Sequence, residues 1–161
     1  MFDNDINRIL TLVKKAGKID GRKKFQKIVF ILQSKGVDLP EKFKYHYYGP
    51  FSSDLQLEID ELVDSKVLIE DHLENNSYSY QISQNTKFDE DSNIVDKELL
   101  INLLNKEDTK VLELTSTIYF LEKEGWSEKE FIEKKLRSLK PDLTKYISKS
   151  FDLKEKIDQM N

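Results

Sequence analysis

The chain contains no cysteine among its 161 residues. This absence excludes disulfide bonds, thiolate zinc sites and cysteine nucleophiles. The apolar runs are only a few residues long, which is too short for a membrane-spanning helix. The N-terminus opens with Asp3 and Asp5 instead of a basic segment before an apolar stretch. We therefore expect no signal peptide, no membrane association and a cytoplasmic location.

Histidine is scarce as well, and neither His46 nor His72 has a nucleophile or a metal ligand at a recognisable spacing. The acidic run at residues 89–91 lacks the alternating ligands and the glycine of a calcium loop, so it is more typical of a linker. Asp142, with residues 152–154, imitates a metal-nuclease signature, but this segment has a helical pattern instead of adjacent strands. The five glycines are scattered singly, which argues against a phosphate-binding loop. We expect no enzyme activity, catalytic residue, metal or cofactor.

The charges present are distributed unevenly. Residues 1–50 hold eleven Lys and Arg against five acids, whereas residues 51–100 hold three lysines against thirteen acids. With 38% hydrophobic and 35% charged residues, the composition is that of a globular protein with a well-solvated surface. An asymmetry of this size bears on the choice of partner and not on the fold.

The first half of the chain has the element order of a winged helix. Apolar spacing and capping residues predict helices at about 4–16, 22–35 and 53–65. A short link at 18–21 separates the first two helices, and an aromatic strand at 43–48, broken by Gly49-Pro50, is inserted before the third. Two strands flanking Glu74-Asn75-Asn76 predict a hairpin. The fold class expected is therefore mainly α (α+β): a winged-helix-like module at 1–84 with a small β-hairpin wing.

The second half is expected to be an appended helical segment. A polar, acidic linker at 85–92 precedes a C-terminal extension at 93–161. We expect helices at about 93–105, 108–124 and 127–139, with Asp108 and Ser127 as N-caps and a further helix from 142 onward. These helices either pack on the module or bridge two copies in a homodimer.

Three segments carry a family resemblance: GRKKFQKIVFILQSKG, FKYHYYGPFSSDLQLEIDELV and LELTSTIYFLEKEG. Together they resemble the YwgA-like proteins of bacteria and archaea over most of the chain. Lys24-Phe25-Gln26-Lys27 followed by Tyr48-Gly49-Pro50 is more distantly similar to the Panacea domain of SocA-type antitoxins, over roughly residues 20–65. The resemblances imply a winged-helix-related fold and a non-enzymatic role, and the second implies neutralisation of a protein toxin.

The third helix is the one that such a module would present to DNA, yet it is acidic. Its outward positions carry five carboxylates and no basic residue before Lys66, so it would repel a phosphate backbone. Leu57 points away from the apolar face and is surrounded by these acids. An apolar anchor inside a polar rim suits a protein interface, although single exposed leucines are also common. The predicted partner-binding residues are Asp54, Leu57, Glu58, Asp60, Glu61 and Asp64.

A basic stretch between Lys14 and Lys27 is the alternative surface, with seven Lys and Arg against one acid. Nucleic acid bound by a transcriptional regulator would approach this stretch along the second helix. The charges could instead solvate two outer helix faces, or pair with the acidic half or a partner. The residues of this candidate nucleic-acid patch are Lys14, Lys15, Arg22, Lys23 and Lys27.

The aromatic residues at 43–51 allow two interpretations. Alternate rings could stack on bases, as in proteins that bind single strands. They could also pack the inserted strand against the second helix. Only Lys42 and Lys44 lie nearby in the sequence, which favours packing. The residues concerned are Phe43, Tyr45, Tyr47, Tyr48 and Phe51.

Overall fold

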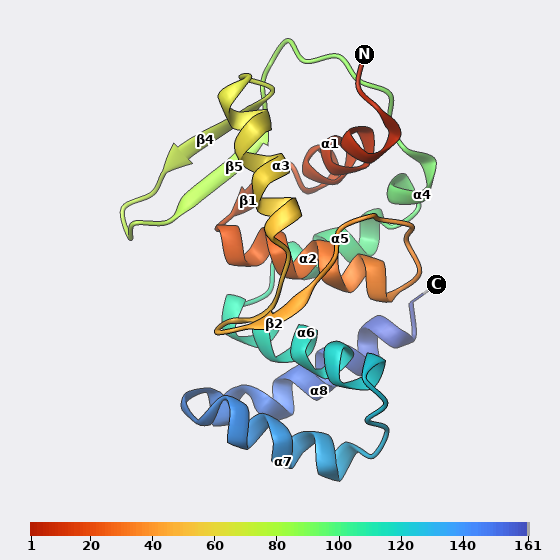
Figure 1. The fold of residues 1–161 in the computed structure, drawn as a ribbon, viewed down its shortest axis with the longest axis vertical. Coiled ribbons are helices and arrows are strands. Elements are labelled where there is room, and N and C mark those ends of the chain that lie inside the picture. The colour runs from red at the N-terminus through yellow and green to blue at the C-terminus, as the bar shows by residue number, and fades with distance from the viewer. Residues whose placement is uncertain (161) are drawn as a thin grey trace.

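The computed structural model describes residues 1–160 and confirms a mainly helical α+β architecture with two small antiparallel sheets (Figure 1). The helices are α1 (Asn4–Ala16), α2 (Arg22–Ser34), α3 (Ser53–Asp64), α4 (Ser92–Val95), α5 (Glu98–Asn105), α6 (Thr109–Lys123), α7 (Lys129–Leu139) and α8 (Ile147–Asp158), with the 3-10 helix η1 (Pro141–Tyr146) before α8. The strands are β1 (Ile19–Asp20), β2 (Lys44–His46), β3 (Gly49–Phe51), β4 (Leu68–His72) and β5 (Tyr78–Ile82). Within residues 1–160, no helix has the length and apolar character needed to cross a bilayer.

Local capping chemistry sets most helix ends. Asp3, Ser52 and Asp108 each accept a backbone hydrogen bond at the start of α1, α3 and α6, which confirms the expected cap at Asp108. Gly17 ends α1 with a φ of 80°, a conformation that favours glycine. The expected cap at Ser127 is wrong: α7 begins two residues later, at Lys129, with Glu128 in the capping position.

A three-stranded antiparallel sheet covers α1 and α2, with the strand order β1-β5-β4. The hairpin β4–β5 was expected, and Asn76 at its turn adopts a φ of 60°. The link at 18–21 was not expected to form a strand, but Ile19 pairs with Tyr80 and Asp20 with Ser79. Because β1 is only two residues long, its pairing depends on a partner strand about sixty residues away and leaves no periodic pattern in the sequence.

The inserted strand also differs from expectation, because Gly49-Pro50 does not end a strand but begins β3. Tyr47 and Tyr48 form the turn of a short hairpin, in which Tyr45 faces Pro50. A two-stranded ribbon leaves the outer edge of each strand unpaired, so a proline without an N–H is tolerated there. Gly49 has a φ of 92°, and a Cβ at this position would lie 3.1 Å from Oγ1 of Thr117 on α6. The hairpin therefore rests directly on α6.

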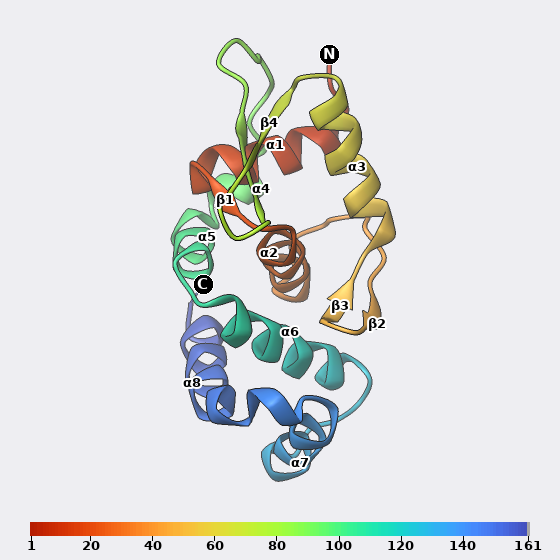
Figure 2. The same cartoon turned by 90° about the vertical axis from the view of Figure 1, so that its left-hand side faces the viewer.

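The C-terminal helices are joined to the first half through α2 (Figure 2). Residues 25–32 of α2 are all buried, because α1 and the sheet lie on one side of the helix and α6 on the other. A second, smaller apolar cluster lies between α6, α7 and α8. The expected helix at 93–105 is broken into α4 and α5, and the last helix is preceded by η1.

The segment 85–92 lies along α1, where its acidic residues form ion pairs with basic residues of that helix. The main apolar cluster includes residues from Ile9 to Ile157, and therefore from both halves of the chain. The division into a module, a linker and an extension stays a prediction.

Candidate functional site

The outward face of α3 is the most uniformly charged helical surface that the sequence singled out. Its inward positions, Leu55, Ile59 and Leu62, pack into the core and fix which side chains face solvent. No basic residue lies within α3. Four of the predicted carboxylates are exposed along this face: Asp54, Asp60, Glu61 and Asp64.

Leu57 lies on the same helix and is 59% exposed. It occupies the helix turn between Asp54 and Asp60, so an apolar side chain is flanked by acids as the sequence predicted. The neighbouring β4–β5 hairpin adds exposed Ile69, Asp71 and Glu74. The surface formed by the exposed residues of α3 and the β4–β5 hairpin is hereafter called the acidic face.

Glu58 differs from the other predicted residues because its side chain is only half-exposed. Burial, and then the negative charge of Glu41, raise the pKa of Glu58 to about 7. Glu41 is 3% exposed, and among residues 1–160 neither of its carboxyl oxygens has a hydrogen-bond partner. Burial raises its pKa to about 7 as well. Sequence reasoning missed Glu41, although its position directly after Pro40, where the chain turns back over α2, was visible.

The candidate nucleic-acid patch is divided by the fold. Lys14 lies 2.8 Å from Glu90, and Lys15 lies 3.6 Å from both Glu90 and Glu98. The first two members of the patch thus pair with acids from the segment after the wing. This arrangement matches the alternative in which the basic stretch pairs with the acidic half of the chain.

Lys27 is not on the surface at all, which corrects its assignment to the patch. It is 1% exposed, and its Nζ donates a hydrogen bond to the carbonyl of Pro50 at 2.6 Å. Burial lowers its pKa to about 8. A helix that is buried on all sides has no outer face, and the uninterrupted apolar run Ile28 to Leu32 next to Lys27 was the signal for this in the sequence.

Arg22 and Lys23 remain at the exposed start of α2. Arg22 lies 3.6 Å from Glu70 of the wing and donates a hydrogen bond to the hydroxyl of Tyr80. The ammonium of Lys23 lies 3.3 Å from the ring centre of Tyr48, as in a cation–π contact.

The motif residues of α2 hold the β2–β3 hairpin in place. The amide of Gln26 donates to the carbonyl of Ser52 and accepts from its N–H, both at 2.9 Å, so it pairs like a strand backbone. Lys27, the next residue of α2, donates a hydrogen bond to the carbonyl of Pro50. Lys24 donates to the carbonyl of Asn105 at 2.8 Å and thereby ties α2 to the end of α5. We call the contacts of Gln26 and Lys27 the hairpin clamp.

A buried ion pair fixes the other side of the hairpin. Lys140, after α7, lies 2.9 Å from Glu113 on α6, and both side chains are buried. The same ammonium donates a hydrogen bond to the carbonyl of Tyr47. A buried charge that lost its partner would be costly, so the position of the hairpin tip is strongly specified.

The aromatic residues in and beside the hairpin divide into packed and exposed ones, which corrects the expectation that packing accounts for all of them. Phe43 packs on Phe30, and Tyr45 packs on Phe120. Tyr47 and Tyr48, by contrast, are 84% and 48% exposed at the turn. The sequence does not reveal this turn, because Gly49-Pro50 is more typical of the end of a strand than of the start of β3.

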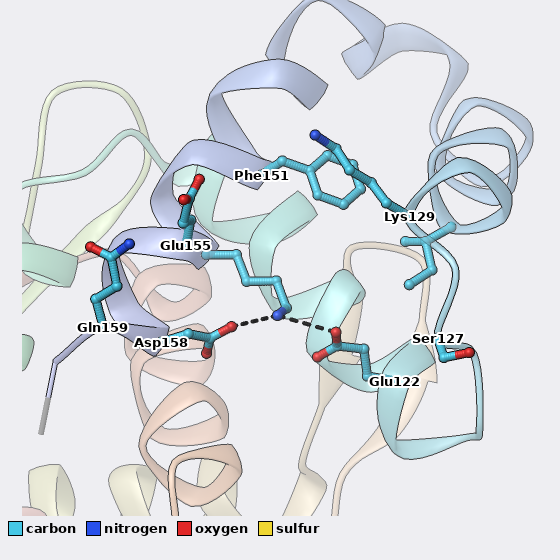
Figure 3. A pocket seen from close by; sticks show the side chains of 9 residues that line it. Glu122, Ser127, Lys129, Phe151, Glu155, Asp158 and Gln159 are labelled. Atoms are coloured by element: carbon cyan, nitrogen blue, oxygen red, sulfur yellow. Dashed lines mark hydrogen bonds and ion pairs between the residues drawn. The ribbon is translucent and has the colours of Figure 1, made fainter.

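The two histidines lie on strands and contact aromatic rings: His46 is next to Phe51, and His72 is next to Tyr78. In the nuclease-like segment, Lys154 bridges Asp158 at 2.5 Å and Glu122 at 3.1 Å beside an open pocket between α6, α7 and α8 (Figure 3). Burial opposes the charge of Lys154, but these two hydrogen bonds raise its pKa. Within residues 1–160, no group of three or more acidic or histidine side chains is arranged to hold a metal ion.

One curated relative defines the family of the chain. The chain is 32% identical, over 133 residues, to the uncharacterized protein YwgA of Bacillus subtilis (strain 168). The match covers 77% of this chain and 80% of that protein. No family model and no solved structure matches the chain.

Proposed function

The chain belongs to the YwgA family, and from this premise we propose that it is a non-enzymatic regulatory protein that binds a basic protein partner through its acidic face. The observation that carries the proposal is the exposed Leu57 on a helix whose solvent side bears only acids among its charged groups.

A winged-helix variant at residues 1–84 is part of the proposal. The order α1, β1, α2, α3, β4, β5 and the sheet order β1-β5-β4 support it. The hairpin β2–β3 is then an insertion between the second and third helices. In helix-turn-helix proteins the last of these helices is the one presented to a ligand, which makes α3 the natural contact element.

The charge of α3 favours a protein over a nucleic acid. Its carboxylates would repel phosphates, and three of the five cations of the candidate nucleic-acid patch are engaged elsewhere, since Lys27 is buried and Lys14 and Lys15 pair with Glu90. Complementary charge across an interface accelerates encounter and selects partners. Leu57 would supply the apolar contact at the centre, with the carboxylates as its rim.

The buried charged groups support a non-enzymatic role because their visible task is structural. Lys27 and Lys140 hold the hairpin, and Glu113 neutralises Lys140. An antitoxin-like activity, in which the basic partner is a toxin, is the narrower form of this proposal and rests on the motif residues of α2 and the hairpin.

A site-specific photocrosslinker tests the proposal. A crosslinking residue in place of Leu57 should capture one basic protein in the native cell. The same residue in place of Leu99, which is 79% exposed on α5, should not capture that protein. With the purified partner, Leu57→Asp should increase the dissociation constant about 30-fold, as for an interface hot spot. Equal capture from both positions would refute the role of α3.

A regulator that binds nucleic acid along α2 stays the alternative. It predicts a gel shift at low salt whose affinity falls steeply as salt increases. Absence of any shift at low salt would remove this alternative.

A further inference from the structure

A cavity of about 330 Å³ lies between the start of α2, the turn of the β2–β3 hairpin and α3. Its size falls within the range of about 300–1,000 Å³ that is usual for small-molecule sites. The residues that line it are Arg22, Lys23, Gln26, Lys27, His46, Tyr47, Tyr48, Gly49, Phe51 and Gln56. Of residues 1–160, none of those lining the cavity is a carboxylate, although the chain is acidic overall.

The charges around this cavity favour an anion. Three cations line it, and Lys23 lies at its rim with its ammonium against the ring of Tyr48. Arg22 donates a hydrogen bond from Nε to the hydroxyl of Tyr80 and lies 3.6 Å from Glu70, but about half of its side chain is exposed to solvent, so part of its guanidinium can still face a ligand. Lys27 donates its hydrogen bond to the carbonyl of Pro50, and in that position its ammonium contributes positive charge to the buried side of the cavity.

The turn places two tyrosine rings beside these cations, packed edge to face at an interplanar angle of 78°. The ring centres of Tyr47 and Tyr48 are 4.9 Å apart, and Tyr47 is almost fully exposed. The cavity therefore places a stacking surface and two exposed cations on the same rim. The hairpin clamp and the pair of Lys140 with Glu113 hold the turn from both sides, so the surface is formed before a ligand arrives.

We propose that this cavity binds a nucleoside phosphate, with its base stacked on the exposed ring of Tyr47 and its phosphate at Arg22 and Lys23. Gln56 of α3 also lines the cavity, and its amide donates a hydrogen bond to Asp60 at 3.1 Å. A second cavity of about 690 Å³ lies across the turn, and its lining includes Lys110 and Lys140 together with Glu113 and Asp142. It offers space next to the first cavity for a neighbouring unit of a strand. The ligand is therefore either a free nucleotide or one unit of a single strand.

The proposal can be tested by titrating each probe into the full chain and monitoring the backbone amide signals by NMR. The probes are AMP, adenosine, inorganic phosphate and a short oligothymidylate. AMP should shift the amides of residues 46–49 and 22–23. It should bind more tightly than adenosine, which lacks the charge, and than phosphate, which lacks the ring. Tighter binding of the oligonucleotide at the same amides would identify a strand as the source; tighter binding of AMP would identify a free nucleotide.

Two variants and two matched controls separate the site from general effects. Tyr47→Ala and Lys23→Ala should each weaken AMP binding at least about fivefold, the lower end for loss of a stacked base. Phe131→Ala and Lys134→Ala, which alter an exposed aromatic and an exposed lysine on α7, should leave it unchanged. Binding of phosphate as tight as AMP, or no shift at 46–49 with any probe, would overturn the proposal. Since Leu57 does not line the cavity, Leu57→Asp should bind AMP normally, so failure here is distinct from failure of the protein-binding role.

Discussion

The buried carboxyl of Glu41 should make the protein less stable as pH rises through the neutral range. Its pKa lies at about 7 instead of the ordinary 4.5, because burial disfavours its charged form. The folded state therefore holds a proton that the unfolded state has lost between pH 4.5 and 7. Stability from this group is fully present below pH 4.5, and it falls as pH rises toward 7.

The size of the effect follows from the two pKa values. Each pKa unit corresponds to about 1.4 kcal/mol, so the full difference is about 3 kcal/mol. Part of this difference is already lost at pH 5, and local relaxation reduces the remainder, so we expect a decrease of about 2 kcal/mol between pH 5 and pH 8.

Urea denaturation at pH 5, 6, 7 and 8 measures this change. Glu41→Gln imitates the protonated acid, so it should be slightly more stable than the parent protein at pH 5, and this advantage should grow by about 2 kcal/mol at pH 8. Glu58→Gln should flatten part of the same slope, because burial also raises the pKa of this half-exposed group. Glu124→Gln, at an exposed position after α6, should change nothing. A parent protein whose stability rises from pH 5 to pH 8, or a Glu41→Gln variant with an unchanged slope, would refute the reasoning.

Four further changes test other parts of the structure. Gln26→Ala should lower the free energy of unfolding by about 1–3 kcal/mol in urea melts, because it leaves the buried N–H of Ser52 unpaired and removes one of the two hydrogen bonds to its carbonyl. Because burial lowers the pKa of Lys27 to about 8, stability should rise between pH 8 and 10.5, and Lys27→Met should abolish that rise; an identical rise in both proteins would contradict the burial argument. Asp108→Ala should cost about 1 kcal/mol in thermal melts through loss of the α6 cap. Leu57→Asp should alter stability by less than about 0.5 kcal/mol, and a larger loss would mean that the side chain is packed rather than exposed.

Features determined by neighbouring residues could be predicted from the sequence. Asp3 and Ser52 cap helices because each oxygen reaches an N–H three residues on, and Gly17 ends α1 by its own backbone conformation. The alternation of buried and exposed positions on α3 was equally local, and it placed Leu57 correctly on the solvent side.

Features determined by distant residues could not be predicted. The pairing of Ile19 with Tyr80 and the salt bridge of Lys14 with Glu90 depend on how separate segments meet. The burial of Lys27 follows from α6 covering the side of α2 that would otherwise face water. Tyr47 became a candidate ligand contact only once the turn between β2 and β3 was known.

Because α2 lies at the centre of the molecule, loss of the elements on either side of it would expose its apolar side chains to water. Phe30 touches Phe43 from the inserted hairpin and Phe120 from α6, with ring centres 5.0 and 6.2 Å away. A fragment ending at residue 84 would lose the second of these contacts together with the cover over the hairpin. Such a fragment would aggregate or bind nonspecifically, so partner and nucleotide assays require the undivided chain.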